Sequence, residues 1–287
     1  METGSSNRST ADRQQLAAHV RAHLPELRGA EARVAQVVLD RGADLVHLSV
    51  SDVAALAGTA PSSVVRACQR LGFRGYQELK IAAARQAPRP APSEDQDPAA
   101  RALANTVQAA RQVLDGLSTT LSVRHLRSAA ETLHRAGRVL VVGAGLSGPV
   151  ATDAAYRLRA LGCAVDAPTD PMTAQLAAGL LPVDGACLAI SHTGATRSTV
   201  DAARRARRAG ATVVALTSYA NSPLSDTSTC TLVAGSQDLV LGLEAVASRL
   251  AHLAVIDALT LTMLAVGGPD AERALALSGD VTADHAY

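Results

Sequence analysis

The sequence is poor in aromatic residues. Its 287 residues include no tryptophan, four tyrosines and a single phenylalanine, Phe73. Proteins that bind single-stranded nucleic acid usually stack the bases on aromatic side chains, so we do not expect that function here. Apolar residues nonetheless make up 48% of the chain and charged residues 18%. This is the composition of a chain that folds around a hydrophobic core.

Paired cysteines, a secretory leader and an uninterrupted apolar span are also lacking. The four cysteines lie tens of residues apart without a CxxC pair, so we expect no zinc site, no disulfides and a reducing compartment. The first 15 residues contain no apolar h-region. The most apolar stretch, residues 239–266, is interrupted by Glu244, Arg249, His252 and Asp257, which a membrane span does not tolerate. We therefore expect a soluble, cytoplasmic protein without membrane contact.

The net charge of +1 conceals a difference between the two ends of the chain. Residues 1–87 carry 11 basic and 8 acidic side chains, whereas residues 88–287 carry 16 and 18. A small basic excess suits contacts with DNA phosphates, but it is also common on solvated helices. Between the two ends, APRPAPSEDQDP (residues 87–98) holds four prolines and three acids, which is typical of an extended linker. We predict a domain over residues 1–87, a linker over 88–98, a second domain over 99–267 and a loosely held polar tail over 268–287.

The hydrophobic pattern changes at the linker. Before it, short helical segments occur without a strand pattern. After two amphipathic helices (99–116 and 123–136), short apolar runs alternate with helical segments, which predicts an α/β doubly wound, five-stranded parallel sheet. The predicted strands are residues 138–142, 163–165, 186–190, 212–216 and 229–233, and the predicted connecting helices are 148–161, 172–181, 198–209 and 222–226. Residues 239–266 are apolar nearly all round and predict a final buried helix.

Two turns after predicted strands have the composition of anion-binding sites. The first, Gly143–Gly148, has the spacing GxGxxG, and its Ser147 is placed to cap the next helix or to bind a phosphate oxygen. With Asp166 about 20 residues further on, this turn alone matches a dinucleotide-binding fingerprint, and a glycine-rich turn without a ligand is the other alternative. The second turn, SHTGAT (residues 191–196), carries three hydroxyl side chains. Two such turns at the carboxyl ends of strands in one sheet favour a sugar phosphate over a dinucleotide.

Before the linker, residues 48–71 predict two short helices joined by a tight turn. Ser51 is expected to cap the first helix, with Val53, Leu56 and Ala57 as its apolar face, and Pro61 to begin the second. In the second helix we expect Val64, Ala67, Cys68 and Leu71 to face inward. The side chains left exposed would be Ser62, Ser63, Arg66, Gln69 and Arg70. This is how an all-α helix-turn-helix domain presents a recognition helix to the major groove of DNA.

These residues carry a family resemblance. The run from Arg138 to Val266, with VGAGLSG, RLRALGCAV, AISHTGATRSTVDAARRARRAGATVVALTSYANSPLSDTST and EAVASRLAHLAVIDAL, resembles the SIS (sugar isomerase) domain. LGFRGYQELK (residues 71–80) resembles the N-terminal domain of RpiR-like transcriptional regulators, which join such a domain to a SIS domain. The chain departs from the pattern by Thr193, where serine is usual, and by Ala60, where a serine cap is usual.

The resemblance implies a function and a set of residues. It implies a transcriptional regulator that binds operator DNA through Ser62, Ser63, Arg66, Gln69 and Arg70, and whose DNA binding responds to a phosphorylated sugar. The sugar phosphate would be held by Ser147, Ser191, Thr193, Gly194, Thr196 and Glu244. We expect a homo-oligomer, either dimer or tetramer, without a cofactor, a metal or catalytic residues.

Two other functions stay open at this point. One is a sugar-phosphate isomerase or etherase with Glu244 as an acid–base group, and the helix-turn-helix counts against it. The other is a redox repressor that senses NADH through Gly143–Gly148, and the second hydroxyl-rich turn counts against it. We expect Cys68, Phe73 and Tyr76 to lie in the core of the first domain and Asp166 to be a strand-end residue, whereas His192 either touches a ligand or is exposed.

Overall fold

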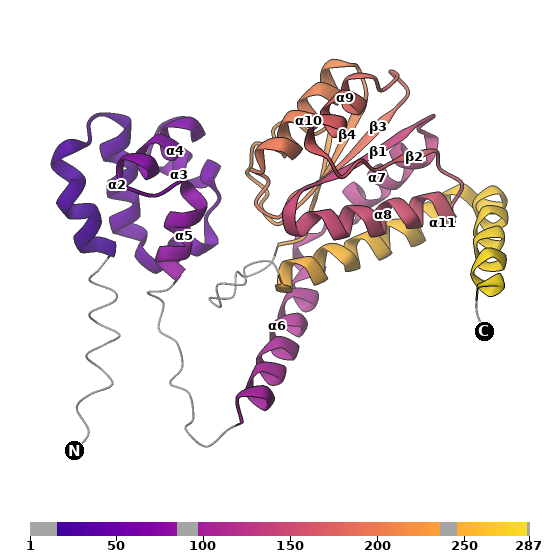
Figure 1. Cartoon of the computed structure of the whole chain (residues 1–287), viewed down its shortest axis with the longest axis horizontal. Helices are drawn as coiled ribbons and strands as arrows, with labels where there is room; N and C mark the ends of the chain where they lie inside the picture. Colours follow the sequence, from indigo (N-terminus) through magenta and orange to yellow (C-terminus); the bar gives the residue numbers. More distant parts are fainter. Residues whose placement is uncertain (1–15, 85–96, 236–245, 286–287) are drawn as a thin grey trace. The chain divides into compact units, whose positions relative to one another are not determined.

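The computed structural model describes residues 16–84, 97–235 and 246–285 (Figure 1). The chain divides into two compact units, and the boundary lies inside helix α6 (Pro98–Thr120), between Val107 and Gln108. Each unit has its own hydrophobic core. Most of the predicted linker lies outside the described residues.

The first unit is helical throughout its described part. A helix over residues 16–23 is followed by η1 (Leu24–Glu26), α2 (Ala30–Arg41), η2 (Gly42–His47), α3 (Val50–Leu56), α4 (Pro61–Arg70) and α5 (Tyr76–Ala84). Tyr76 is buried, and its hydroxyl donates to the backbone oxygens of Leu45 (3.2 Å) and Leu48 (2.9 Å). Phe73 packs against the same core, its ring edge-on to His19. The two aromatic residues therefore lie in the core of this unit, as predicted.

The second unit is built on a parallel five-stranded sheet. After α6 and α7 (Val123–Arg135) come β1 (Val139–Gly143), β2 (Val165–Asp166), β3 (Ala186–Ile190), β4 (Thr212–Thr217) and β5 (Cys230–Val233), in the spatial order β2-β1-β3-β4-β5. The connecting helices are α8 (Gly148–Ala160), α9 (Pro171–Gly179) and α10 (Arg197–Arg208). The predicted doubly wound parallel sheet is confirmed. Residues 222–226, expected to be helical, form a series of turns instead.

Alternate strand residues face opposite layers of helices, as side chains with a period of two must. Val139 and Val141 of β1 share a core cluster with α7, α8 and α11 (Val246–Asp284). Leu140 and Val142 belong to the cluster that contains α9 and α10. Figure 1 shows these two layers on the two faces of the sheet. Both faces are covered, which is why the strands are continuous apolar runs in the sequence.

The sheet order reverses between β1 and β3. From β1 the chain crosses through α8 to β2 at one edge, whereas from β3 it crosses through α10 to β4 on the other side. In open α/β sheets, ligands bind outside the carboxyl ends of the strands at such a switch point. Gly143 at the end of β1 pairs with Ile190 at the end of β3. The turns that follow these two strands therefore lie side by side.

Helix α11 differs from expectation at its C-terminal end. We expected residues 268–287 to be a loosely held polar tail, but the helix continues to Asp284 after a kink at Gly268 (φ 55°). Ala271, beyond the kink, is buried in the core of the unit. Within the described residues, the part of this helix from Ser248 to Asp284 is the one segment long and apolar enough to cross a membrane. Its Val255, Ile256 and Met263 are instead buried against the sheet and its covering helices.

Candidate functional site

The first helix of the predicted helix-turn-helix begins at a capping box. The Ser49 hydroxyl accepts from the Asp52 amide (3.0 Å), and the Asp52 carboxylate accepts from the Ser49 amide (2.9 Å). The prediction of Ser51 as the cap is therefore wrong by two residues. An acid at the third helical position completes the reciprocal pair only for Ser49. Leu56, expected on the buried face of this helix, is 47% exposed.

The turn between α3 and α4 is held by a side chain from α2. Arg33 donates to the backbone oxygens of Ala57 (2.8 Å) and Gly58 (3.2 Å), and Gly58 takes a left-handed conformation with φ 58°. These bonds satisfy carbonyls that a helix leaves unpaired at its C-terminus. Helix α4 then begins at Pro61, and its N-cap, Ala60, makes no side-chain capping bond. The angle between the two helices is thus supported from α2, without the serine cap that the family pattern has.

One face of α4 is exposed, and it differs in part from the predicted one. Val64, Ala67, Cys68 and Leu71 are buried as expected. Ser63, predicted to be exposed, is 6% exposed, and its hydroxyl accepts from Arg66 (3.0 Å). The prediction for Ser63 is wrong because position 63 lies one helical turn before the buried Ala67. The exposed residues are Ser62, Val65, Arg66, Gln69 and Arg70.

The charge and shape of this α4 face suit a DNA groove. Among the described residues, no carboxylate lies within ion-pair distance of Arg66 or Arg70, so both guanidinium groups face solvent without an acidic partner. Val65, 37% exposed, was not predicted as a contact, although its spacing of three from Ser62 marks it as part of the same face. An exposed apolar group suits contact with a thymine methyl, and arginine suits guanine or phosphate.

In the second unit, the turn after β1 requires two glycines. A Cβ at Gly143 would lie 2.7 Å from the backbone oxygen of Ser147, so the chain folds back on itself only without a side chain there. Gly145 has φ 57°, a conformation that glycine adopts at no steric cost. Ser147 ends the short helix η3 (Gly145–Ser147) and precedes α8, but its side chain makes no capping bond. Ser147 is half-buried as a residue, and its hydroxyl is left available to a ligand.

The turn after β3 is held by hydrogen bonds between its own residues and by the close approach of Ser222 to Gly194. Ser191 is fully buried, and its hydroxyl donates to the Thr196 hydroxyl (3.0 Å). Thr193 accepts from the Ala195 amide (3.2 Å). Gly194 has φ 61°, and a Cβ there would lie 2.2 Å from the Ser222 hydroxyl. Because Ser191 donates to Thr196, the hydrogen of the Thr196 hydroxyl is left for another acceptor.

Five of the six predicted ligand residues are thus gathered in two adjacent turns at the switch point: Ser147, Ser191, Thr193, Gly194 and Thr196. Glu244 lies outside the described residues. His192, between Ser191 and Thr193, is half-buried, and its Nδ1 is hydrogen-bonded to the Ser218 hydroxyl (2.8 Å).

Ser218 is also hydrogen-bonded to a second histidine, which lies in the core. Its hydroxyl is 3.1 Å from Nε2 of His252 on α11, which is 2% exposed. Burial, with the neighbouring His192 as a smaller cause, lowers the pKa of His252 to about 3. His252 is therefore neutral at physiological pH. This chain of two histidines and a serine connects the second turn to α11, and no spacing in the sequence indicates it.

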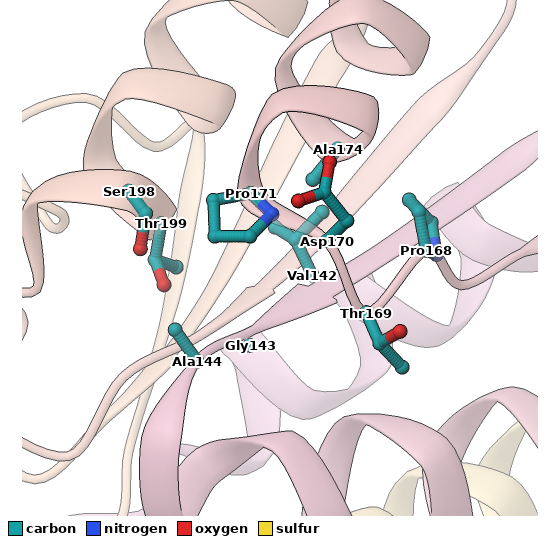
Figure 2. Close-up of a pocket in the computed structure, with 10 residues that line it drawn as sticks. All are labelled: Val142, Gly143, Ala144, Pro168, Thr169, Asp170, Pro171, Ala174, Ser198 and Thr199. Carbon is teal, nitrogen blue, oxygen red and sulfur yellow. The ribbon is translucent and has the colours of Figure 1, made fainter.

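A pocket opens beside the two turns (Figure 2). Its walls come from the end of β1, the loop after β2, the start of α9 and the first turn of α10, and about 250 Å³ of space lies between them, part of it open to solvent. Asp170 caps α9, accepting from the amide (2.7 Å) and hydroxyl (2.9 Å) of Thr173, and these bonds lower the pKa of its carboxyl. Thr199 is 2% exposed, and its hydroxyl has no hydrogen-bond partner.

Sequence reasoning missed this pocket. The run Asp170-Pro171-Met172-Thr173 has the composition of a helix N-terminus, so Asp170 could have been placed at the carboxyl edge of the sheet. Nothing in the sequence distinguishes Thr199 from an ordinary helical threonine.

Two further predictions bear on the alternatives. Asp166, which a dinucleotide-binding site would place on a ribose, forms an ion pair with Arg138 at the end of β2. It is thus a strand-end residue with a partner inside the protein. Cys68 is fully buried, and burial raises the pKa of its thiol to about 12. It is a core residue, as predicted.

Comparison with known proteins identifies the family. The helix-turn-helix domain of the rpiR family matches residues 14–88, and the SIS domain matches residues 132–262. An HTH-type transcriptional regulator of Caldanaerobacter subterraneus subsp. tengcongensis is 31% identical over 234 residues, which are 80% of this chain and 83% of that protein. HexR of Pseudomonas aeruginosa, also an HTH-type transcriptional regulator, is 31% identical over 254 residues, 85% and 87% of the two chains. The chain belongs to the rpiR family of helix-turn-helix transcriptional regulators.

Two solved structures are similar to this chain in fold. The Vibrio vulnificus NanR protein complexed with ManNAc-6P aligns with a TM-score of 0.81 and 25% sequence identity over 94% of this chain and 99% of that one. The sugar isomerase domain of the RpiR transcription factor from Sphaerobacter thermophilus aligns with a TM-score of 0.53 and 25% identity over 65% and 99%. The predicted family and both predicted domain folds are confirmed.

Proposed function

We propose that this rpiR-family regulator binds operator DNA through the exposed face of α4, and that a phosphorylated sugar at the β1–β3 switch point modulates this binding. The observation that supports this proposal most strongly is the pair of hydroxyl-bearing turns at one switch point, in a chain that also has a helix-turn-helix. The similarity to NanR, which was solved with a phosphorylated sugar, supports the class of effector.

Neutral groups hold the phosphate in this proposal. Neither turn contains lysine or arginine, and the nearest in the sequence, Arg197, is 96% exposed and forms an ion pair with Asp201 (3.6 Å). The positive ends of α8 and α10 therefore provide the favourable field. Ser147 and Thr196 donate to phosphate oxygens, whereas the buried Ser191 acts by orienting the Thr196 hydroxyl.

On the DNA side, Arg66 and Arg70 supply the charge. Ser63 holds the Arg66 guanidinium by a hydrogen bond, which limits its rotation before DNA is bound and lowers the entropic cost of the contact. Ser62 and Gln69 provide further hydrogen-bonding groups on the same face.

The protein acts as a homo-oligomer in the cytoplasm and leaves its effector chemically unchanged. One helix-turn-helix reads few base pairs, so these proteins present two or more recognition helices to a palindrome. On the second unit, Tyr156 of α8 and Leu261 of α11 are 61% and 67% exposed. The layer formed by these helices is therefore the surface that we assign to contacts between copies.

The experiment uses the full-length protein and an operator selected from random DNA by repeated binding. Operator affinity is measured by fluorescence anisotropy with and without a panel of sugar phosphates, after a thermal-shift screen for binding. An effector at 100 times its Kd adds ~2.7 kcal/mol to stability, a shift that the screen detects. We expect one class of sugar phosphate to bind and to change operator affinity at least severalfold.

Controls separate the two sites and the two chemistries. Arg66→Ala is expected to weaken operator binding and keep effector binding, and Ser147→Ala to weaken effector binding and keep operator binding. NMR of the sugar after incubation with the protein should show no product. Effector binding without any change in operator affinity, or turnover of the sugar, would overturn the proposal.

A further inference from the structure

The pocket beside the two turns has a lining that the hydroxyl groups assigned to the phosphate do not supply. It is lined by Gly143 and Ala144, which begin the first turn, and by Ser198 and Thr199, which follow shortly after the second. A sugar whose phosphate lies between the turns would therefore place its ring, or a substituent of the ring, at the mouth of this pocket. Figure 2 shows Asp170 and Pro171 on the opposite side from Ser198 and Thr199.

The Thr199 hydroxyl has no hydrogen-bond partner in the protein, which suits it to bind a ligand. A buried hydroxyl without a hydrogen bond is unfavourable, and such groups are rare in folded proteins. Thr199 is 2% exposed and lines the pocket from the first turn of α10. A ligand carbonyl in the pocket would accept from this hydroxyl and remove the unfavourable term.

The opposite wall offers an acceptor and apolar surface. The Asp170 carboxylate is fixed by its two bonds from Thr173 and has further lone pairs for a donor from a ligand. The remaining wall is apolar, formed by Val142, Pro168, Pro171 and Ala174. The pocket thus combines a hydroxyl donor, a carboxylate acceptor and a surface for a small apolar group.

We propose that this pocket binds the acylamino group of a phosphorylated amino sugar and makes the regulator selective for N-acylated effectors. The amide N–H donates to Asp170, the amide carbonyl accepts from Thr199, and the methyl group contacts the prolines and Ala174. A sugar hydroxyl would leave the apolar wall uncovered, and an ammonium group would leave Thr199 without an acceptor. The inference rests on the proposed function, since it requires the phosphate to lie between the two turns.

The test is calorimetry on the full-length protein with three ligands that differ only at the 2-position: glucose 6-phosphate, glucosamine 6-phosphate and N-acetylglucosamine 6-phosphate. The corresponding manno series is measured in parallel, so that ring stereochemistry does not decide the result. In at least one series, we expect the N-acetyl sugar to bind about tenfold or more tightly than the other two, because a site built for a hydrogen-bonding group rejects ligands without it.

Variants of Thr199 and Asp170 test whether these two residues cause the preference for the N-acetyl sugar. Thr199→Val keeps the shape and removes the hydroxyl, so it should lower N-acetyl sugar affinity roughly three- to tenfold and leave the hydroxyl sugar unchanged. Thr199→Ser restores the hydroxyl and should restore the preference. Asp170→Asn still caps α9 but replaces the carboxylate, and it should also weaken the N-acetyl sugar selectively. Because the Thr199 hydroxyl has no protein partner, Thr199→Val should not lower the melting temperature, which a structural role would require.

The outcomes separate this inference from the function on which it rests. Equal binding of the three sugars, or a preference that survives both Thr199→Val and Asp170→Asn, would overturn the acylamino pocket and leave the sugar-phosphate effector standing. Failure of every sugar phosphate to bind would overturn both.

Discussion

Replacing Gly194 by alanine tests how rigidly the second turn is built. Gly194 has φ 61°, and a Cβ there would lie 2.2 Å from the Ser222 Oγ and 2.4 Å from the Ser222 Cβ. A left-handed alanine costs ~1–2 kcal/mol, and overpacking a closed site costs a further ~1–3 kcal/mol. We therefore expect Gly194→Ala to lower the free energy of unfolding of the second unit by about 2–5 kcal/mol.

Gly268 provides a matched control in the same unit. Its φ is 55°, but a Cβ there would meet nothing within 4 Å, so Gly268→Ala should carry only the backbone strain of ~1–2 kcal/mol. Urea unfolding followed by far-UV circular dichroism measures both variants, since the chain has no tryptophan to report by fluorescence. Equal losses would show that Ser222 moves aside freely and that the turn is not clamped.

The same substitution has a functional consequence. To accommodate the Cβ, the segment from Ser191 to Thr196 must move away from Ser222, and this displaces the hydroxyls of Thr193 and Thr196. Gly194→Ala should therefore lose sugar-phosphate binding, whereas Gly268→Ala keeps it. Full effector affinity in Gly194→Ala would remove this turn from the binding site.

Three further results are expected. Arg66→Ala should weaken specific operator binding by ~1–3 kcal/mol in anisotropy titrations, and Ser63→Ala by less, because Ser63 only supports Arg66; a larger effect of Ser63→Ala would contradict that role. The pKa of His252 is about 3 in the folded state, against the ordinary histidine value of 6.5, so below pH 6.5 the unfolded chain takes up a proton that the folded chain does not. Stability should fall by up to ~1.4 kcal/mol per pH unit as the pH drops from 6.5 toward 3, and His252→Gln should remove that contribution from urea midpoints measured across this range. The Cys68 thiol, with its pKa raised to about 12, should resist thiol reagents until the first unit unfolds, and rapid labelling of the native protein would show that α4 opens readily.

The helices and strands could largely be predicted because their periodicity is local. In the sheet, helices cover both faces of each strand, so buried strands are continuous apolar runs. The runs at residues 186–190 and 212–216 could therefore be recognised as strands. In α4, the spacing of Val64, Ala67, Cys68 and Leu71 defines the buried side. Ser63 was misplaced because a small polar residue carries little hydrophobic signal, and its burial depends on the neighbouring helices.

Helix ends and the last helix were predicted less well. The cap of α3 lies at Ser49 instead of Ser51, since two serines compete and only the reciprocal bond with Asp52 decides between them. The chain after Gly268 remains helical because Ala271 packs into the core, a contact between residues far apart in the sequence.

The sequence by itself determined the family, the two-domain order, the parallel sheet and the two turns, because each depends on residue types at short, fixed spacings. Only the tertiary structure decided which groups meet at the switch point. Thr199 and Asp170 face one pocket because α9 and α10 lie on the same face of the sheet, and His192 reaches His252 through Ser218 because α11 covers the other face. Burial and hydrogen bonding between distant segments set these contacts, and no local pattern in the chain encodes them.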